Sequence, residues 1–439
     1  MNSTQQFAMN IVLIVRLYPP VNSSGAKRAE ALSKYFVRMG HNVSVITPAK
    51  TLADGDLTES TPEGVDLIEL DGKGQDSESR AVGQPHEPLY AENRSCKRLI
   101  KDTVMEVLGQ LPDPRLPFVL SLRSKRLSTR ADRALRKAHV VIGSCPPWSM
   151  LLAALFVKWR FRTPIVLDYR DNFSENPEMP GSRFAKWLER KADRWLIANA
   201  DQAVAATVIM QDYYSSMSKT PCAMIMNGYD HEKVQLAFET ARVKEDGLVR
   251  IRHTGLVSPQ RIPHAFTTAL EIFMEENPQA AARIRLEFYG YSDVFRRHVS
   301  DEHAKLSDII SFHKTVPHHD VLKLMRSADY LLFCGYVDDY GASARGMLTT
   351  KLFEYLATGR PVLAHIDPTF SAAELIQESG GHHLISATPD DYLDLLRSDT
   401  FFDRKSDYFG SKIESLTRES QARDYAELLG RLVFNSKES

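Results

Sequence analysis

Neither positive nor negative residues predominate in this chain, and that balance already excludes one class of partner. Its 439 residues contain 55 Lys and Arg against 56 Asp and Glu, so the formal net charge is -1. Because no global positive field attracts phosphate backbones, we expect no nucleic-acid partner. Any electrostatic argument must therefore concern a local patch.

Cysteine and long apolar runs are also scarce. The 4 cysteines are far apart and form neither a C-x-x-C pair nor a Cys/His group with zinc spacing, which favours a reducing, cytoplasmic location. The first apolar run, Ile11–Val15, is too short for the core of a signal peptide. No stretch reaches the ~18 to 20 apolar residues that cross a bilayer. We expect a cytoplasmic protein, soluble or peripheral on the cytoplasmic membrane face.

What the chain does contain is a regular alternation of short apolar runs and amphipathic stretches, which is typical of βαβ units with parallel sheets. In the first half we predict strands at residues 10–15, 42–47, 65–70, 140–143, 165–168, 202–206 and 223–226. A second series is predicted at 250–253, 285–289, 309–312, 330–334, 361–364 and 382–385. The pattern predicts two similar α/β domains.

The domain boundary is predicted after Asp230, because residues 231–247 are charged and lack a strand pattern. This gives a first domain at 1–230 and a second at 231–410. A last amphipathic helix is predicted from Arg418 to Val433.

The first strand is followed by Pro, Asn, Ser and Gly residues that lead into a helix expected at 25–39. Such a junction presents backbone N–H groups and the positive end of the helix dipole at the carboxyl edge of the sheet, where open α/β sheets bind ligands. Gly25 and Arg28 are therefore candidate ligand contacts. The alternative is an ordinary loop with an N-cap at Ser23 or Ser24.

A second candidate site begins at Thr349 and Thr350, which precede a short expected helix. Backbone N–H groups at its start could bind a diphosphate. Glu354 lies one turn after Lys351 on the same face, and by itself this spacing predicts only a surface ion pair.

Charged residues also end the strand predicted at 165–168. Asp171 could orient an acceptor hydroxyl and Arg170 could bind an anionic group. A structural Arg–Asp pair is the alternative.

In their order along the chain, these segments resemble the landmarks of glycosyltransferase family 4. The resemblance runs from about Asn10 to Leu363 and is carried by Pro19-Pro20, Gly25, residues 40–47, 168–171, 227–230, 255–261 and above all 351–363. It implies the GT-B fold: two facing Rossmann-like domains, with parallel sheets and a C-terminal crossover helix that returns residues 411–439 to the first domain. The acceptor would bind largely to the first domain and a nucleotide-sugar donor to the second, with retention of anomeric configuration.

The resemblance also implies roles for single residues. Arg261, six positions after Gly255, matches a basic residue that contacts the donor diphosphate and stabilises its growing charge. Glu354 matches the second glutamate of an E-x7-E motif and would accept hydrogen bonds from ribose hydroxyls. The implied donor-binding residues are Gly255, Arg261, Thr349, Thr350, Lys351 and Glu354. The implied acceptor-binding residues are Gly25, Arg28, Arg170 and Asp171, and the catalytic candidates are Arg261 and Asp171.

The sequence departs from the family pattern at Gly346, where the first glutamate of E-x7-E is missing, and at Leu256, where many members have an arginine. Lys351 or Arg345 could restore the positive charge. Ser144–Pro147 stands at the strand end where the family has a His-Glu-Pro segment.

We therefore expect a metal-independent hexosyltransferase that acts in polysaccharide biosynthesis. It would use a nucleotide-sugar as co-substrate, no cofactor, and a glycan or lipid-linked hydroxyl as acceptor. A nucleotide-sugar epimerase and a non-catalytic nucleotide-sugar-binding scaffold are the alternatives. We expect no metal site, because Asp54-Gly-Asp56 follows no apolar strand, and His41, His318 and His319 have no ligand spacing with Cys or Asp.

The largest local charge lies at residues 94–137, where 12 Lys and Arg against 4 Asp and Glu give 12 − 4 = +8. A helix within 115–137 would turn Phe118, Val119, Leu120, Leu122 and Leu127 toward lipid and its cations toward anionic head groups. We predict that this segment contacts an anionic membrane surface. A solvated basic helix, or a face for an anionic soluble acceptor, are the alternatives.

Overall fold

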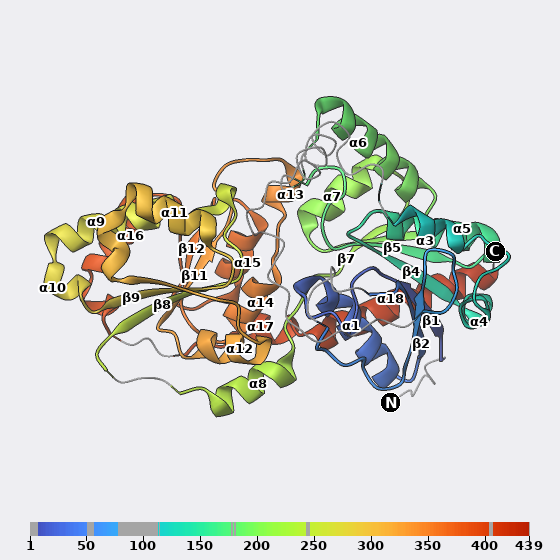
Figure 1. The fold of residues 1–439 in the computed structure, drawn as a ribbon, viewed down its shortest axis with the longest axis horizontal. Coiled ribbons are helices and arrows are strands. Elements are labelled where there is room, and N and C mark those ends of the chain that lie inside the picture. Colours follow the sequence, from blue (N-terminus) through green and yellow to red (C-terminus); the bar gives the residue numbers. More distant parts are fainter. Residues whose placement is uncertain are drawn as a thin grey trace. The chain divides into compact units, whose positions relative to one another are not determined.

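The computed structural model describes residues 8–50, 57–77, 113, 115–176, 179, 181–242, 246–403 and 407–438 (Figure 1). The chain divides into two compact units. Unit 1 contains Met1–Met226, Gly341–Ser343 and Arg418–Ser439, and unit 2 contains Asn227–Tyr340 and Ala344–Thr417. The domain limits expected from the sequence were 230 and 410, whereas the units change at Met226 and Thr417.

Unit 1 is built on a seven-stranded sheet of order β3-β2-β1-β4-β5-β6-β7, and every pairing in it is parallel. The strands are β1 (Asn10–Ile14), β2 (Asn42–Pro48), β3 (Val65–Leu70), β4 (Val140–Cys145), β5 (Ile165–Tyr169), β6 (Gln202–Ala205) and β7 (Cys222–Met224). Its helices are α1 (Ser24–Arg38), α3 (Leu116–Ser121), α4 (Thr129–Lys137), α5 (Ser149–Phe161), α6 (Arg183–Ala198), α7 (Val208–Met217) and α18 (Arg418–Glu438).

The central strands of unit 1 are largely apolar because both faces of the sheet are covered. Side chains alternate between faces along a strand, so Val12 and Ile14 join one buried cluster, while Ile11 and Leu13 join the other. Helices α1 and α18 lie side by side over the second cluster (Figure 1).

Unit 2 repeats this design with a six-stranded parallel sheet of order β10-β9-β8-β11-β12-β13. The strands are β8 (Val249–Thr254), β9 (Ile284–Tyr289), β10 (Ile310–His313), β11 (Tyr330–Cys334), β12 (Val362–His365) and β13 (Leu384–Ser386). The helices are α8 (His231–Thr240), α9 (His264–Glu276), α10 (Pro278–Ala281), α11 (Asp293–Glu302), α12 (His318–Arg326), α14 (Thr350–Ala357), α15 (Ser371–Ser379), α16 (Pro389–Arg397) and α17 (Ser411–Ser415). A short helix, α13 (Ala342–Arg345), spans the change of unit. The two-domain α/β fold with parallel sheets is thereby confirmed.

The prediction for residues 115–137 is wrong in one respect. Phe118, Val119, Leu122 and Leu127 are buried in the core of unit 1, and of the apolar residues proposed to face lipid only Leu120 is exposed, at 57%. The apolar side of α3 covers the sheet together with α5, because a parallel sheet needs cover on both faces. Residues 94–112 and 114, which complete the basic segment, lie outside the described residues. Among the helices that the structure describes, none is long and apolar enough to cross a membrane.

Candidate functional site

The loop that follows β8 forms one side of the candidate donor site in unit 2. Gly255 has a φ of +94°, a conformation that glycine adopts without strain. A β-carbon at Gly290, in the loop after β9, would lie 2.9 Å from the carbonyl oxygen of Gly255. Glycine at both positions therefore allows the two loops to touch at the carboxyl edge of the sheet.

Lys351, on the first turn of α14, reaches this loop. Its Nζ lies 3.3 Å from the carbonyl oxygen of Leu256 and 3.2 Å from Nε2 of His253. The structure thus brings Lys351 next to Gly255 and puts a cation beside Leu256, where the expected arginine is missing. Arg345 instead pairs with Asp339 at 2.8 Å on the surface.

His253, in β8, is a residue that the sequence analysis missed. Burial, and then the positive charge of Lys351, lower the pKa of its imidazole well below the ordinary value, so it is neutral near pH 7. Its Nδ1 lies 2.9 Å from the carbonyl oxygen of Leu332 and donates to it. The lone pair on Nε2 is then available to accept from Lys351, which makes His253 a positioning residue for that cation.

Arg261 ends a 3-10 turn, Pro259–Arg261, and is buried. Its Nε donates to Oγ of Ser258 at 2.9 Å, and its guanidinium lies 5.6 Å from the ring centroid of Tyr336. Its Nη1 is 3.9 Å from Sδ of Met347, in the segment before α14. Three segments, after β8, after β11 and before α14, therefore meet around this cation.

Glu354 is buried on α14, and its Oε1 lies 2.9 Å from Nε2 of His318. His318 begins α12, and the sequence analysis had considered it only as a metal ligand, a role that its spacing did not support. A pairing between two helices could not be inferred from spacing along the chain. His319, by contrast, is exposed and pairs with Asp320 at 3.1 Å.

The start of α14 has the features of an anion site. Thr349 occupies the N-cap position, but its hydroxyl makes no capping bond and its Oγ1 is buried without a hydrogen-bond partner. The first N–H groups of a helix lack partners within the helix. At Thr349, Thr350 and Lys351 the chain therefore offers backbone donors and a cation together, which suits a diphosphate.

The carboxyl edge of the sheet in unit 1 holds a different arrangement. Arg28, from α1, makes a buried ion pair with Asp168 at 2.8 Å and donates to the carbonyl oxygens of Met226 and Ile225 at 2.8 and 3.1 Å. Ser144, at the end of β4, donates to the same carboxylate at 2.7 Å. Arg28 thus ties α1, β4, β5 and the segment after β7 together, and its role as an acceptor contact stays a prediction.

Arg170 and Asp171 follow β5 at the same edge. The Arg170 guanidinium donates to the carbonyl oxygens of Gly25, Cys145 and Pro146, with 3.2 and 2.8 Å for the last two. The bond to Gly25 brings together two residues that were predicted to bind the acceptor, Gly25 and Arg170. Asp171 is exposed.

Asn172, the next residue, is a candidate that the sequence analysis missed. It is buried, yet both polar atoms of its amide lack a hydrogen-bond partner. Buried amides are nearly always paired, so this one is available to a ligand hydroxyl.

Comparison with known proteins agrees with this architecture. Residues 25–228 match the model of the glycosyl transferase 4-like domain. The fold is similar to that of sucrose-phosphate synthase from Thermosynechococcus elongatus (14% identity, 98% of this chain and 97% of that chain, TM-score 0.57). It is also similar to α,α-trehalose 6-phosphate synthase from Burkholderia multivorans (11% identity, 97% of each chain, TM-score 0.59) and to HepE of Anabaena, solved with UDP and glucose (13% identity, 98% of each chain, TM-score 0.53). A search of curated proteins gave no match. The family resemblance is confirmed over residues 25–228, and the GT-B fold is confirmed by the solved structures.

Proposed function

From its glycosyl transferase 4-like domain and its GT-B fold, we propose that this chain is a glycosyltransferase that moves a hexose from a nucleoside-diphosphate donor to a hydroxyl. The observation that carries the donor assignment is the meeting of Arg261, Lys351 and the start of α14 at one edge of unit 2. UDP is the first nucleotide to test, because HepE was solved with it.

The roles of the residues in sugar transfer follow from the negative charge that develops on the leaving diphosphate. When the bond between the anomeric carbon and the phosphate oxygen breaks, the leaving diphosphate gains negative charge. Arg261 and Lys351 offset that charge, and the N–H groups at the start of α14 donate hydrogen bonds to it. We propose that Glu354 accepts hydrogen bonds from the ribose and that His318 fixes its carboxylate.

Metal independence is part of this proposal. Two cations and a helix start supply the positive charge that a divalent ion supplies in other transferases. The sugar is expected to be transferred with retention, and Asp171 with Asn172 would orient the acceptor hydroxyl.

A thermal-shift panel of UDP, GDP, ADP and CMP tests the donor assignment. A nucleotide at ~100 times its dissociation constant stabilises a protein by roughly 2.7 kcal/mol. We expect one nucleoside diphosphate to stand out and its effect to be lost in Arg261→Ala. The matched control is Lys305→Ala, which removes an exposed cation of unit 2 that pairs with Glu275. Equal responses to all four nucleotides would contradict the proposal.

Product analysis then separates the alternatives. A transferase gives a free nucleoside diphosphate and a glycosylated acceptor, an epimerase gives a new nucleotide-sugar without an acceptor, and a scaffold gives neither.

We further propose a lipid-linked acceptor at an anionic membrane, and the support comes from α6 rather than from residues 115–137. Phe184, Trp187 and Trp195 are 65%, 50% and 45% exposed and lie along one face of α6, at spacings of three and eight residues. The acidic residues of this helix, Glu189 and Asp193, are buried on the opposite face. This inverts the usual pattern, in which a surface helix buries its large apolar residues.

The charge of this face fits an anionic surface. Exposed basic residues flank the aromatic ones: Arg183, Arg190, Lys191 and Arg194. Lys191 lies 5.7 Å from the ring centroid of Trp187. Tryptophan and phenylalanine bury well at the head-group level, and each basic residue near an anionic surface adds about 1 kcal/mol.

Co-sedimentation with vesicles at low salt decides between the two segments. Phe184→Ala and the triple change of Arg183, Lys191 and Arg194 to Glu should reduce recovery with anionic vesicles. Phe434→Ala, in α18, is the matched control because its side chain is 64% exposed. The triple change of Arg123, Lys125 and Arg126 to Glu tests the segment first expected to bind. Equal recovery with neutral and anionic vesicles would leave a soluble acceptor as the better assignment.

A further inference from the structure

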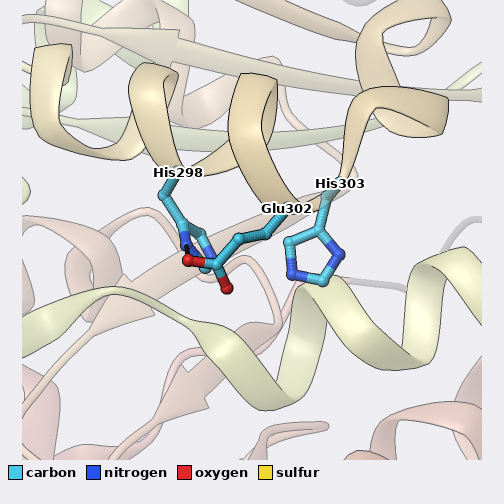
Figure 2. A group of neighbouring side chains, drawn as sticks. All are labelled: His298, Glu302 and His303. Carbon is cyan, nitrogen blue, oxygen red and sulfur yellow. Dashed lines mark ion pairs between the residues drawn. The ribbon is translucent and has the colours of Figure 1, made fainter.

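Unit 2 contains a group of side chains outside the candidate donor site that has the composition of a metal centre. His298 and Glu302 are four residues apart on α11 and so lie on one face, and His303 follows directly (Figure 2). One ligand atom from each of the three lies within 4.8 Å of the others. Figure 2 shows the Glu302 carboxylate between the two imidazole rings.

The two imidazoles are buried but incompletely hydrogen-bonded. His298 is 7% exposed; its Nδ1 is 3.2 Å from Glu302, and its Nε2 is buried without a partner. A buried polar atom without a partner is unfavourable by roughly 1–3 kcal/mol. A bond from Nε2 of His298 to a metal ion would take the place of the missing hydrogen bond.

His303, 9% exposed, has one nitrogen occupied by a carboxylate: its Nδ1 lies 2.7 Å from Glu271 on α9. Its Nε2 is 3.4 Å from the hydroxyl oxygen of Thr267. That hydroxyl has a single hydrogen, and its oxygen is also 2.9 Å from the carbonyl oxygen of His264. The shorter bond takes that hydrogen, so the Nε2 lone pair has no good donor. A carboxylate behind a ligating histidine is the common arrangement at metal sites, because it fixes the ring and raises its basicity.

A third imidazole is close by. His264, the first residue of α9, lies with its ring centroid 4.6 Å from that of His298, in an edge-on arrangement. The His264 side chain is exposed, so it can rotate to bring one ring nitrogen toward an ion held by the other three residues.

We propose that His298, Glu302 and His303, with His264 as the fourth ligand, bind one divalent transition-metal ion of the zinc class, and that Glu271 is a positioning residue for His303. Imidazole and carboxylate together suit zinc and its neighbours, whereas calcium and magnesium prefer oxygen ligands. Tetrahedral zinc, with ligands at ~2.1 Å, needs ligand atoms about 3.4 Å apart. The exposed Glu302 side chain can rotate to close the remaining distance.

The proposal goes beyond the transferase function and differs from the expectation of no metal site. That expectation considered other histidines. The relevant pattern was His298-x3-Glu302-His303, to which the preceding helix α9 adds His264 and Glu271. The ion would fix α9 against the end of α11. It takes no part in sugar transfer, because its ligands are not the groups assigned to the diphosphate.

Calorimetry of the untagged full chain with zinc chloride, without nucleotide, tests the site. We expect one saturable zinc ion per chain and a higher melting temperature. Glu302→Gln changes an exposed side chain and should weaken zinc binding at least tenfold. Glu271→Gln should weaken it by roughly 10- to 100-fold.

Two variants control for adventitious binding. Asp301→Asn removes an exposed carboxylate next to Glu302, and His319→Ala removes an exposed histidine outside the group. Both should bind zinc like the original chain. Cobalt absorption in the visible range should report a four-coordinate site that Glu302→Gln loses. Absence of one-to-one binding, or equal affinities of Glu302→Gln and Asp301→Asn, would overturn the proposal whatever the transferase assays give.

Discussion

The two units share one design and differ in how they hold positive charge at the carboxyl edge of the sheet. In unit 1, Arg28 is locked to Asp168 and to two backbone carbonyls. In unit 2, Arg261 is held by a hydroxyl and an aromatic ring, and Lys351 by a neutral imidazole and a carbonyl. The charge of Arg28 is offset by the Asp168 carboxylate, as expected for a structural ion pair, whereas Arg261 and Lys351 lie around the start of α14, where helix N–H groups lack intrahelical partners. This difference supports the proposal that the diphosphate binds to unit 2.

The first prediction tests the structural half of the comparison. Asp168→Ala leaves Arg28 buried without its counter-charge and should lower the free energy of unfolding by about 3–5 kcal/mol. Arg130→Ala is the control, because its ion pair with Asp66 is exposed and should contribute about 0–1 kcal/mol. Urea unfolding measures both. A loss no larger than that of Arg130→Ala would mean that the network does not stabilise unit 1.

The second prediction tests the functional half. Arg261→Ala should lower turnover by roughly 10² to 10³, because the cation acts where charge develops in the transition state. Steady-state kinetics should show the loss in kcat, while Lys305→Ala keeps the original rate. Unchanged kinetics in a folded Arg261→Ala protein would make this donor assignment wrong.

The third prediction concerns the pair that joins α12 and α14. Glu354→Ala should weaken nucleotide binding with a smaller effect on turnover, and His318→Ala should weaken binding by roughly tenfold, or ~1.4 kcal/mol, by releasing the carboxylate. His319→Ala is the matched control on the same helix. Titration calorimetry with the preferred nucleotide measures all three. Equal affinities of the two histidine variants would remove His318 from the site.

The sequence predicted the strands to within two residues because each is an apolar run bounded by turn residues. It could not predict pairings such as Arg28 with Asp168 or His318 with Glu354, since these depend on which helix ends meet. Apolar periodicity also does not say whether a stripe faces a core or a membrane. Phe118 and Leu122 are buried where exposure was expected, and α6 buries Glu189 and Asp193 while it exposes Trp187.

Burial shifts the pKa of two groups in opposite directions, one in each unit, because it disfavours the charged form of both a carboxyl group and an imidazole. In unit 2, burial lowers the pKa of His383 to about 4. In unit 1, burial raises the pKa of Asp193 to about 7, against the hydrogen bonds that it accepts from Ser174 and Tyr169.

The smallest predicted effect follows from these opposite shifts. Between pH 3.8 and about 7 folded Asp193 keeps a proton that the unfolded chain releases, so its contribution to stability is lost as the pH rises. Between pH 6.5 and about 4 unfolded His383 takes up a proton that the folded chain excludes, so its contribution is lost as the pH falls. The measured quantity is the free energy of unfolding of each variant minus that of the original chain. For Asp193→Asn this difference should rise by on the order of 1 kcal/mol from pH 5 to pH 8. For His383→Gln it should rise by a similar amount from pH 8 to pH 5. Urea unfolding at both pH values measures this, with the exposed Asp212→Asn and His319→Gln as controls. If both variants shifted in the same direction, burial would not control these two pKa values in the way proposed.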